Sequence, residues 1–374
     1  MQQASVTIRS GELVALRLFD IAYAIDLAQA EAAWLSHAGG VGRRGRLITA
    51  PPKALSFGVP PLDLPLEPMT LTLDGVAMSA RVSVRLYDFG VAAFALRVTV
   101  ADAAWPDFVA RFNALDRAVG PASSDPMWVA LRDQLCAAVA PALDRPASDA
   151  SLQEDYLLGI VHALDEPLDA DALRLRVDLA ALLSGETRAL SDGARRELLA
   201  HSYSYFADDL VLLTWDRAFI YEPRGDSDVA DVIEVANAQL LEFRYYDALL
   251  DDELPRMYAR VQAARGAGSL LAARRFAHLA RGLYMLVAEA TELTEKVDNA
   301  LQVTEDVYLA RVYSAALGLF RVPALSASVD RKLAIVRDTY AALYEEASSR
   351  RSEWLEIAIV LLIVLEVVLT LLRY

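Results

Sequence analysis

The sequence predicts an α+β protein in which two α/β units with antiparallel sheets precede a helical coiled-coil arm and a C-terminal transmembrane helix. Three observations support this prediction. Runs of alternating β-branched and aromatic residues are interleaved with helical patterns over residues 1–225. Apolar residues then repeat every seven positions from residue 276 onward. The chain closes on an almost unbroken apolar segment, RRSEWLEIAIVLLIVLEVVLTLLRY.

The composition limits the classes of protein to which this chain can belong. With 374 residues, 55% of them hydrophobic, the chain can bury the cores of two or three domains. The formal net charge of −15 argues against direct nucleic-acid binding, which normally uses a basic face. One cysteine, Cys136, and four scattered histidines provide neither a disulfide framework nor a zinc motif, so no metal or other cofactor is expected.

The first predicted α/β unit covers residues 1–145. Its expected elements are a strand, a helix, a hairpin and two more helices, over Glu12–Phe19, Ala24–Leu35, Met78–Val100, Trp105–Leu115 and Asp125–Pro141. The hairpin should turn near Asp88–Gly90, and proline after Trp105 suits the first turn of a helix. A glycine- and proline-rich stretch before the hairpin excludes long regular structure but admits a short strand in KALSFGV.

A similar order recurs in the second predicted unit, residues 146–225. A strand is expected over Asp155–Leu164 and a helix over Asp169–Leu183, stopped by Ser184–Gly185. A second hairpin should span Ser202–Pro223, with its turn at Asp216–Arg217. The repeated order suggests two related units, although few residues are identical between them.

Residues 226–352 are expected to be helical. One helix should run into a second that begins at Asp251–Asp252, with Pro255 in its first turn. The first heptad seam consists of Phe276, Leu283, Ala290, Val297 and Thr304, and of Leu279, Leu286, Leu293, Ala300 and Val307. After a break at Gly318 and Pro323, the second seam consists of Val329, Leu333, Val336, Tyr340, Leu343 and Ala347. Two such helices predict an antiparallel coiled-coil hairpin, with an intermolecular coiled coil as the alternative.

The last region, residues 353–374, is the predicted membrane anchor. The spacing of the second seam continues into it, so one long helix should enter the apolar segment. The helix from Trp354 to Tyr374 would be about 30 Å long, close to the thickness of a bilayer core. Leucine, isoleucine and valine contribute about −0.5 kcal/mol each to insertion, and together they outweigh about 3 kcal/mol for a carboxyl group. The alternative is an apolar helix buried in a soluble oligomer.

Five residues of the tail are candidate functional residues: Arg350, Arg351, Trp354, Glu356 and Glu366. The tryptophan suits a membrane interface, and the two arginines favour the cytoplasmic side for the bulk of the chain. Glu366 lies inside the apolar run, where it is either protonated in lipid or paired with a neighbouring helix. A role in docking a partner or in setting the register of an oligomer is the alternative. No catalytic, cofactor-binding or metal-binding residue is predicted.

Other short motifs lack the partners that their chemistry requires. DFG at Asp88–Gly90 has no HRD loop or glycine-rich loop beside it, so a hairpin turn is expected. The pair Asp208–Asp209 suits a cap or turn better than a cation site. Tyr203, Tyr205 and Phe206 are expected to pack in a strand, with a base-stacking platform as the alternative.

Three stretches resemble the required-for-meiotic-nuclear-division family, which has fungal, mitochondrial and bacterial members. They are VRLYDFGVAAFAL (Val84–Leu96), DDELPRMYARV and the ending RRSEWLEIAIVLLIVLE. The resemblance covers roughly Arg81 to Leu372. It implies a membrane-anchored, non-enzymatic protein. Some mitochondrial members support organelle translation by holding ribosomes near the inner membrane, which implies a ribosome-associated partner.

The leading hypothesis is a membrane-anchored scaffold or tether that organises a partner without catalysis. It would be a homo-oligomer in the inner (cytoplasmic) membrane, held by a single C-terminal helix, with its bulk in the cytoplasm and an unidentified protein partner. The alternative is an enzyme or phosphate-ligand-binding protein with a site between the α/β units. In that case Arg43, Arg44 and Arg46 of GGVGRRGR would hold the phosphate.

Overall fold

The computed structural model describes residues 6–38, 43–44, 55–120, 126–147, 151–186, 188–225, 228–265, 277–285, 287–288, 290–291, 301–303 and 306–372. They belong to two compact units. The first comprises Met1–Glu242 and Lys296–Pro323, and the second comprises Phe243–Glu295 and Ala324–Tyr374. Helices and largely antiparallel strands are both present, so the predicted α+β class is confirmed.

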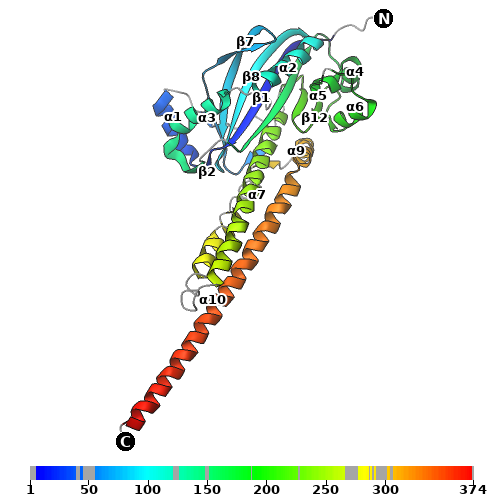
Figure 1. The fold of residues 1–374 in the computed structure, drawn as a ribbon. Coiled ribbons are helices and arrows are strands. Elements are labelled where there is room, and N and C mark those ends of the chain that lie inside the picture. The colour runs from blue at the N-terminus through cyan, green and yellow to red at the C-terminus, as the bar shows by residue number, and fades with distance from the viewer. Residues whose placement is uncertain are drawn as a thin grey trace. The chain divides into compact units, whose positions relative to one another are not determined.

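A ten-stranded sheet forms the centre of the first unit (Figure 1). Its path runs β11-β12-β13-β10-β1-β8-β7-β5-β3, and β6 also pairs with β7. The bounds are β1 Thr7–Asp20, β3 Arg43–Arg44, β5 Leu62–Pro65, β6 Met69–Leu73, β7 Val76–Leu86, β8 Val91–Ala104, β10 Gln153–Leu164, β11 Ser202–Tyr203, β12 Leu210–Leu213 and β13 Arg217–Tyr221. Only β10 and β13 run parallel among these pairs of described strands.

The single sheet corrects the prediction of one antiparallel sheet per α/β unit. Strand β1 pairs with β8 on one edge and with β10 on the other, so that Leu13 lies opposite both Val98 and Gly159. Residues 13–20 of β1 are all buried, which is typical of a strand in the middle of a sheet. The two predicted segments therefore contribute to one core. Two small ladders join β2 (Ala22–Ile25) to β9 (Leu143–Pro146) and β4 (Leu55–Phe57) to β14 (Leu301–Val303).

The helices of the first unit lie on the sheet and around it (Figure 1). Their bounds are α1 Leu27–Ala38, α2 Trp105–Val119, α3 Met127–Ala138, α4 Ala170–Arg176, α5 Leu179–Ser184, α6 Asp192–Leu198 and α9 Val307–Leu319. Helix α2 packs on β1 and β8 and buries Phe108 and Phe112 completely. These rings join one hydrophobic cluster with Leu13 and Ala15 of β1. Because side chains alternate along a strand, Val14 and its even-numbered neighbours face the other side of the sheet.

Helix α7 (Val229–Arg265) begins on that other side of the sheet. Its residues 232–242 are buried without interruption. Arg85 and Tyr87, which alternate with the core-facing Val84 and Leu86 of β7, contact Glu234 of this helix. A helix that is buried all round normally carries apolar residues only, yet this stretch includes Glu234, Asn237, Gln239 and Glu242. These polar groups therefore need partners inside the protein.

The hairpin predicted over Met78–Val100 is confirmed as β7 and β8. Gly90, in the turn, has a φ of +102°, a conformation that side chains other than glycine rarely adopt. A Cβ at this position would lie 1.8 Å from the carbonyl oxygen of Ala22. The turn also bonds to the chain beside it, because the backbone N–H of Ile25 donates to Asp88 O at 3.0 Å. DFG is thus a turn that closes on β2.

The predicted helix over Asp169–Leu183 is divided into α4 and α5 in the structure. The Asp169 carboxylate accepts a hydrogen bond from Ala172 N at 2.7 Å, and the Asp178 carboxylate accepts one from Ala181 N at 3.1 Å. Each aspartate therefore caps its own helix, and Asp178 starts a new helix where the sequence pattern suggested continuity. The predicted stop is confirmed, because Gly185 ends α5 with a φ of 65°.

The predicted helix start at Asp251–Asp252 is wrong, since α7 continues through Pro255. The acidic residues have a different role. Lys332 of α10 (Val322–Leu372) lies 2.7 Å from the Asp247 carboxylate and 2.6 Å from that of Asp251. Asp251 thus forms an ion pair between two helices of the second unit, and this tertiary contact favours an uninterrupted α7.

Replacing Pro255 with alanine is expected to stabilise the chain by about 1–3 kcal/mol. Proline inside a helix lacks a donor and clashes with the preceding turn, at a cost of about 3 kcal/mol relative to alanine. Denaturant unfolding of the full chain in detergent micelles measures the change. Pro106 is the matched control, because it lies in the first turn of α2, where proline is tolerated. Equal effects of Pro255→Ala and Pro106→Ala would contradict the expectation.

The heptad predictions have a mixed outcome. Val329, Leu333, Val336 and Leu343 of the second seam are buried, and Leu343 packs with Ala280. Partly buried Val261, Leu279, Leu283 and Tyr340 surround that contact. The prediction that the first seam continues in a helix is wrong at Leu301–Val303. These residues form the strand β14, whose backbone groups pair with β4. Phe276, Leu286, Leu293, Val297, Ala300 and Thr304 lie outside the described residues.

Candidate functional site

The predicted tail residues all lie on α10, which is one continuous helix from Val322 to Leu372. The expectation that one helix enters the apolar segment is therefore confirmed. Arg350, Arg351 and Trp354 are helical, and their side chains lie outside what the structure describes. Glu356 and Glu366 are exposed. The Thr370 hydroxyl donates to the Glu366 backbone carbonyl oxygen at 2.8 Å, so the Thr370 side chain is bonded within its own helix.

The apolar part of α10 is exposed on every side. From Ile357 to Leu369, the leucine, isoleucine and valine side chains are between 45% and 64% exposed. A helix of a soluble protein normally buries at least one apolar stripe, and residues 356–370 bury none. Among the described residues, no single helix has the length and apolarity to cross a membrane. The consecutive helices α9 and Val322–Glu345 meet those criteria only together, with a bend between them.

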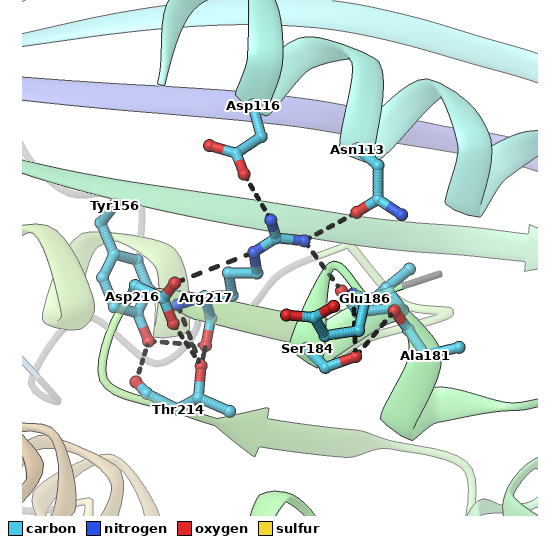
Figure 2. A network of polar contacts seen from close by, with 10 residues as sticks. Asn113, Asp116, Tyr156, Ala181, Ser184, Glu186, Thr214, Asp216 and Arg217 are labelled. Atoms are coloured by element: carbon cyan, nitrogen blue, oxygen red, sulfur yellow. Dashed lines mark hydrogen bonds and ion pairs between the residues drawn. The ribbon is translucent and has the colours of Figure 1, made fainter. Parts of the chain in front are cut away.

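A polar network in the first unit is centred on Arg217 at the start of β13 (Figure 2). Its Nη1 donates to Asn113 Oδ1 at 2.8 Å and to the Leu182 carbonyl oxygen at 3.2 Å. Its Nη2 donates to Asp116 Oδ2 at 2.5 Å. The side chain is 5% exposed, and its guanidinium lies 5.4 Å from the centre of the Phe112 ring. One arginine thus connects β13 to α2 and α5.

The surroundings of Arg217 indicate a structural role. The Tyr156 hydroxyl donates to the carbonyl oxygens of Thr214 and Arg217 at 2.8 and 2.9 Å, which fixes the turn before β13 (Figure 2). A Cβ at Gly185 would lie 2.4 Å from Arg217 Nη2, so this glycine leaves room for the guanidinium. The Thr214 hydroxyl also bonds to Asp216 Oδ1 at 3.1 Å and to the Arg217 carbonyl oxygen at 2.9 Å, so it holds the same turn in place.

A second polar cluster joins β7 to the first turns of α7. Arg85 lies 2.7 Å from Asp63, 2.6 Å from Asp231 and 3.4 Å from Glu234. The Tyr87 hydroxyl donates to Glu234 Oε1 at 2.9 Å. Burial raises the pKa of Glu234, and the charge of Arg85 opposes that shift. The pKa of Tyr87 is well above its usual value, chiefly because the ring is buried. This cluster supplies partners for a buried glutamate of α7.

A pair of buried carboxyl groups lies between β1 and α7. Burial raises the pKa of Asp20 to about 7, although a hydrogen bond with the Ala22 backbone lowers it. Burial also raises the pKa of Glu242, and the charge of Asp20 adds to that shift. Both carboxyl groups therefore bind protons more tightly in the folded chain than in the unfolded chain.

This pair predicts a pH dependence of stability. Between about pH 4 and pH 7, the folded chain keeps a proton at Asp20 that the unfolded chain has lost, so stability should fall as the pH rises. Each unit of pKa difference corresponds to about 1.4 kcal/mol. Asp20→Asn should flatten this part of the profile, measured by denaturant unfolding at a series of pH values. Asp107→Asn, an exposed control on α2, should keep the wild-type slope. An unchanged slope in Asp20→Asn would refute the expectation.

The structure does not bring the arginine-rich loop and the acidic pair of the sequence analysis into one site. Arg43 and Arg44 are paired through their backbones with Asp63 and Leu62, and Arg46 lies outside the described residues. Both carboxylate oxygens of Asp209 accept backbone hydrogen bonds within its own loop, as expected for a turn. Within the described ranges, no group of three or more histidine, cysteine, aspartate or glutamate residues could hold a metal ion.

Sequence reasoning missed the two arginine clusters. Their partners lie between 22 and 149 residues away, beyond the reach of local patterns. One local signal was present. Glu234 interrupts the apolar run VIEVANAQLLEF, and Arg85 interrupts the strand pattern VSVRL. A charged residue inside an otherwise apolar element indicates a buried partner.

Comparison with known proteins identifies relatives of the first unit. Residues 10–228, more than half of the chain, match the family described as the N-terminal domain of the uncharacterized protein MJ0711. The uncharacterized protein MJ0711 of Methanocaldococcus jannaschii is 26% identical over 194 residues, which cover 52% of this chain and 58% of that protein. The chain thus spans little more than half the length of this relative. No solved structure matches the chain.

Proposed function

We propose that this chain, which belongs to the family of the MJ0711 N-terminal domain, is a non-enzymatic scaffold anchored in a membrane by its C-terminal helix. The observation that carries the proposal is the exposure of apolar side chains on every side of α10 between Ile357 and Leu369. A large exposed apolar surface marks contact with a membrane or with another protein.

Lipid is the favoured partner of this surface for two reasons. The apolar side chains surround the helix, whereas a helix in a soluble oligomer usually keeps one polar face. Arg350, Arg351 and Trp354 precede the apolar residues in the order expected at a membrane interface. The resemblance to the required-for-meiotic-nuclear-division family adds support, because its ending matches this segment and its members are membrane-anchored.

The helices of the second unit, apart from the anchor itself, would serve as a coiled-coil arm. Leu343 of the second heptad seam packs with Ala280 of the helical residues 277–285, and Val261 of α7 lies at the same contact. Three helical stretches thus share one apolar contact, which supports a bundled arm. A homo-oligomer in the inner (cytoplasmic) membrane, with the first unit in the cytoplasm, is the arrangement that we propose. From the family resemblance we further propose that the partner is ribosome-associated.

The alternative is an enzyme or a phosphate-binding protein that uses Arg43, Arg44 and Arg46. The arginine clusters offer it little support, because Arg85 and Arg217 are each bonded to protein carboxylates. Removal of residues 354–374 separates the two functions. The scaffold predicts that the full chain is found in the membrane fraction and the truncated chain in the supernatant, and that neither binds inorganic phosphate or ATP saturably. Saturable binding that is lost in Arg43→Ala/Arg44→Ala/Arg46→Ala would favour the alternative.

Replacing Glu366 with leucine should leave the chain in the membrane fraction. The change removes a carboxyl group from the apolar run and makes insertion more favourable by about 3 kcal/mol. Membrane fractionation and crosslinking of the same sample check the location and the oligomeric state. Glu356→Leu, near the interface, is the matched control. An oligomer lost only in Glu366→Leu would assign Glu366 to docking, and loss of Glu366→Leu from the membrane would contradict the anchor.

A further inference from the structure

Three aromatic rings form a partly exposed cluster on the first unit, which we call the aromatic patch. Tyr205 and Phe206 lie in the loop between β11 and β12, and Tyr308 lies in the first turn of α9. The centre of the Tyr205 ring is 4.7 Å from that of Phe206 and 5.7 Å from that of Tyr308. Tyr205 is 65% exposed and Phe206 is 43% exposed. A cluster of exposed rings is more informative than one exposed ring, because contiguous apolar patches mark contact surfaces.

Backbone hydrogen bonds hold the rings of the aromatic patch in place. The Asp209 carboxylate accepts hydrogen bonds from the backbone N–H groups of Tyr205 and Phe206, at 2.7 and 3.1 Å. The Asp306 carboxylate accepts one from Tyr308 N at 2.8 Å and so caps α9. Because the loop and the helix start are both fixed, a ligand of the patch would order little additional structure on binding.

Carboxylates surround the aromatic patch. The pKa of Tyr308 is raised by burial first, and then by the charges of Asp209, Glu222 and Asp306. These three acidic residues come from the loop before β12, the end of β13 and the start of α9. Three carboxylates thus lie near the rings, against the one guanidinium of Arg224 on Phe206, which leaves an excess of negative charge among these named groups. Such an excess attracts a cation and repels the phosphates of a nucleic acid.

The patch already holds one guanidinium group from its own chain. The Arg224 guanidinium carbon lies 4.2 Å from the centre of the Phe206 ring, within the range of a cation–π contact. Tyr205 is the most exposed ring of the three and lies directly beside Phe206. Tyr205 is thus an exposed ring directly beside a ring that already contacts a cation, which favours a guanidinium or ammonium group as its ligand.

We infer that the aromatic patch, with Asp209, Glu222 and Asp306, binds an arginine- or lysine-bearing segment of a partner protein. A guanidinium or ammonium group of the partner stacks on Tyr205, and the carboxylates supply the opposite charge. The inference goes beyond the scaffold proposed above, since it gives the chemistry of the partner. It does not depend on the anchor, because binding in detergent solution and location in the membrane are separate measurements.

Fluorescence anisotropy with the full chain in detergent micelles tests the inference. The probe is a fluorescein-labelled peptide of alternating arginine and glycine, about ten residues long to span the patch. Tyr205→Ala should weaken binding about threefold, the effect of one exposed cation–π contact. Tyr205→Ala/Glu222→Gln should weaken it about tenfold, because the double variant also loses charge beside the ring. Binding should weaken as salt is added.

The controls separate the aromatic patch from the general acidity of the chain. Trp215→Ala removes another exposed ring, in the turn at the opposite end of β12, and should leave the affinity unchanged. Thermal unfolding of each variant checks that the fold is retained. If Tyr205→Ala does not fold, the isosteric single variant Glu222→Gln tests the charge alone and should weaken binding about threefold. No binding of the peptide, or equal affinity in all folded variants, would overturn the inference. Tighter binding of an oligouridylate that is lost in Tyr205→Ala would overturn it in favour of base stacking.

Discussion

The variant Leu361→Lys/Val364→Lys is expected to leave the membrane fraction and appear in the supernatant. Both positions lie in the apolar run of α10 and are more than half exposed, so neither substitution disturbs a packed core. A lysine in mid-helix costs about 3 kcal/mol on insertion scales and replaces a side chain worth about −0.5 kcal/mol. Two substitutions thus cost about 7 kcal/mol, which lowers partition into the bilayer by roughly 10⁵-fold.

The matched control for this variant is Leu361→Ala/Val364→Ala. It shortens the same two side chains without adding charge, so it should remain in the membrane fraction. Immunoblots of pellet and supernatant after ultracentrifugation measure both variants against the unmodified chain. A double-lysine variant that stays with the membrane would contradict insertion of this segment, because Glu366 could neutralise only one of the two ammonium groups in lipid.

The second large effect is expected for Arg217→Ala, which should destabilise the chain by about 3–5 kcal/mol. Removing one partner of a buried ion pair leaves the other charge without compensation. Here Asp116 would lose its 2.5 Å contact, and Asn113 and the Leu182 carbonyl would each lose a donor. Arg217→Lys should recover only part of the loss, because a single ammonium group cannot reproduce the forked contacts of guanidinium.

Denaturant unfolding of the full chain in detergent micelles measures the effect of Arg217→Ala. Arg117→Ala is the matched control, because Arg117 follows Asp116 on α2 and its contact with Asp74 is exposed on both sides. Such surface ion pairs contribute about 0–1 kcal/mol to the free energy of unfolding. If the two variants lose the same free energy of unfolding, the buried network around Arg217 does not have the structural role given to it above.

Elements with strong local patterns were predictable from the sequence. The alternating residues of β7 and β8, the buried run of β1 and the proline at the start of α2 each depend on neighbours in the chain. The stop at Gly185 belongs to the same class, since a left-handed residue after a helix favours glycine. Local chemistry decides these features, so reading a single sequence is sufficient for them.

Features that depend on distant partners were not predictable in the same way. The acidic residues before Pro255 have the composition of a helix start, but Lys332, 81 positions after Asp251, makes them part of an ion pair inside the second unit. Pairing of β1 with β10 joins two segments that the repeated pattern separates. The choice between one sheet and two depends on which edges are left to pair, and alternation within a strand does not contain that information.

Of the candidate sites, one was predictable from local sequence and the other depends on distant residues. The apolar tail is evident from composition alone, because the physical property that matters is an average over many residues. The aromatic patch needs the fold, since Tyr308 lies about a hundred residues after Tyr205 in the chain and meets it only when α9 packs beside the β11–β12 loop. The prediction that Tyr205 and Phe206 pack in a strand is wrong, because both lie exposed in the loop between β11 and β12. Their acidic surroundings come from three separate elements.

The most direct test of the anchor is flotation of the unmodified, full-length chain. Membranes from a detergent-free lysate are washed with alkaline carbonate, which removes peripheral proteins, and are then floated through a density gradient. The anchored scaffold predicts that the chain rises with the lipid after the wash. Recovery of the chain at the bottom of the gradient, as a discrete oligomer of defined size, would show that protein covers the exposed side chains of α10 and would contradict the proposal.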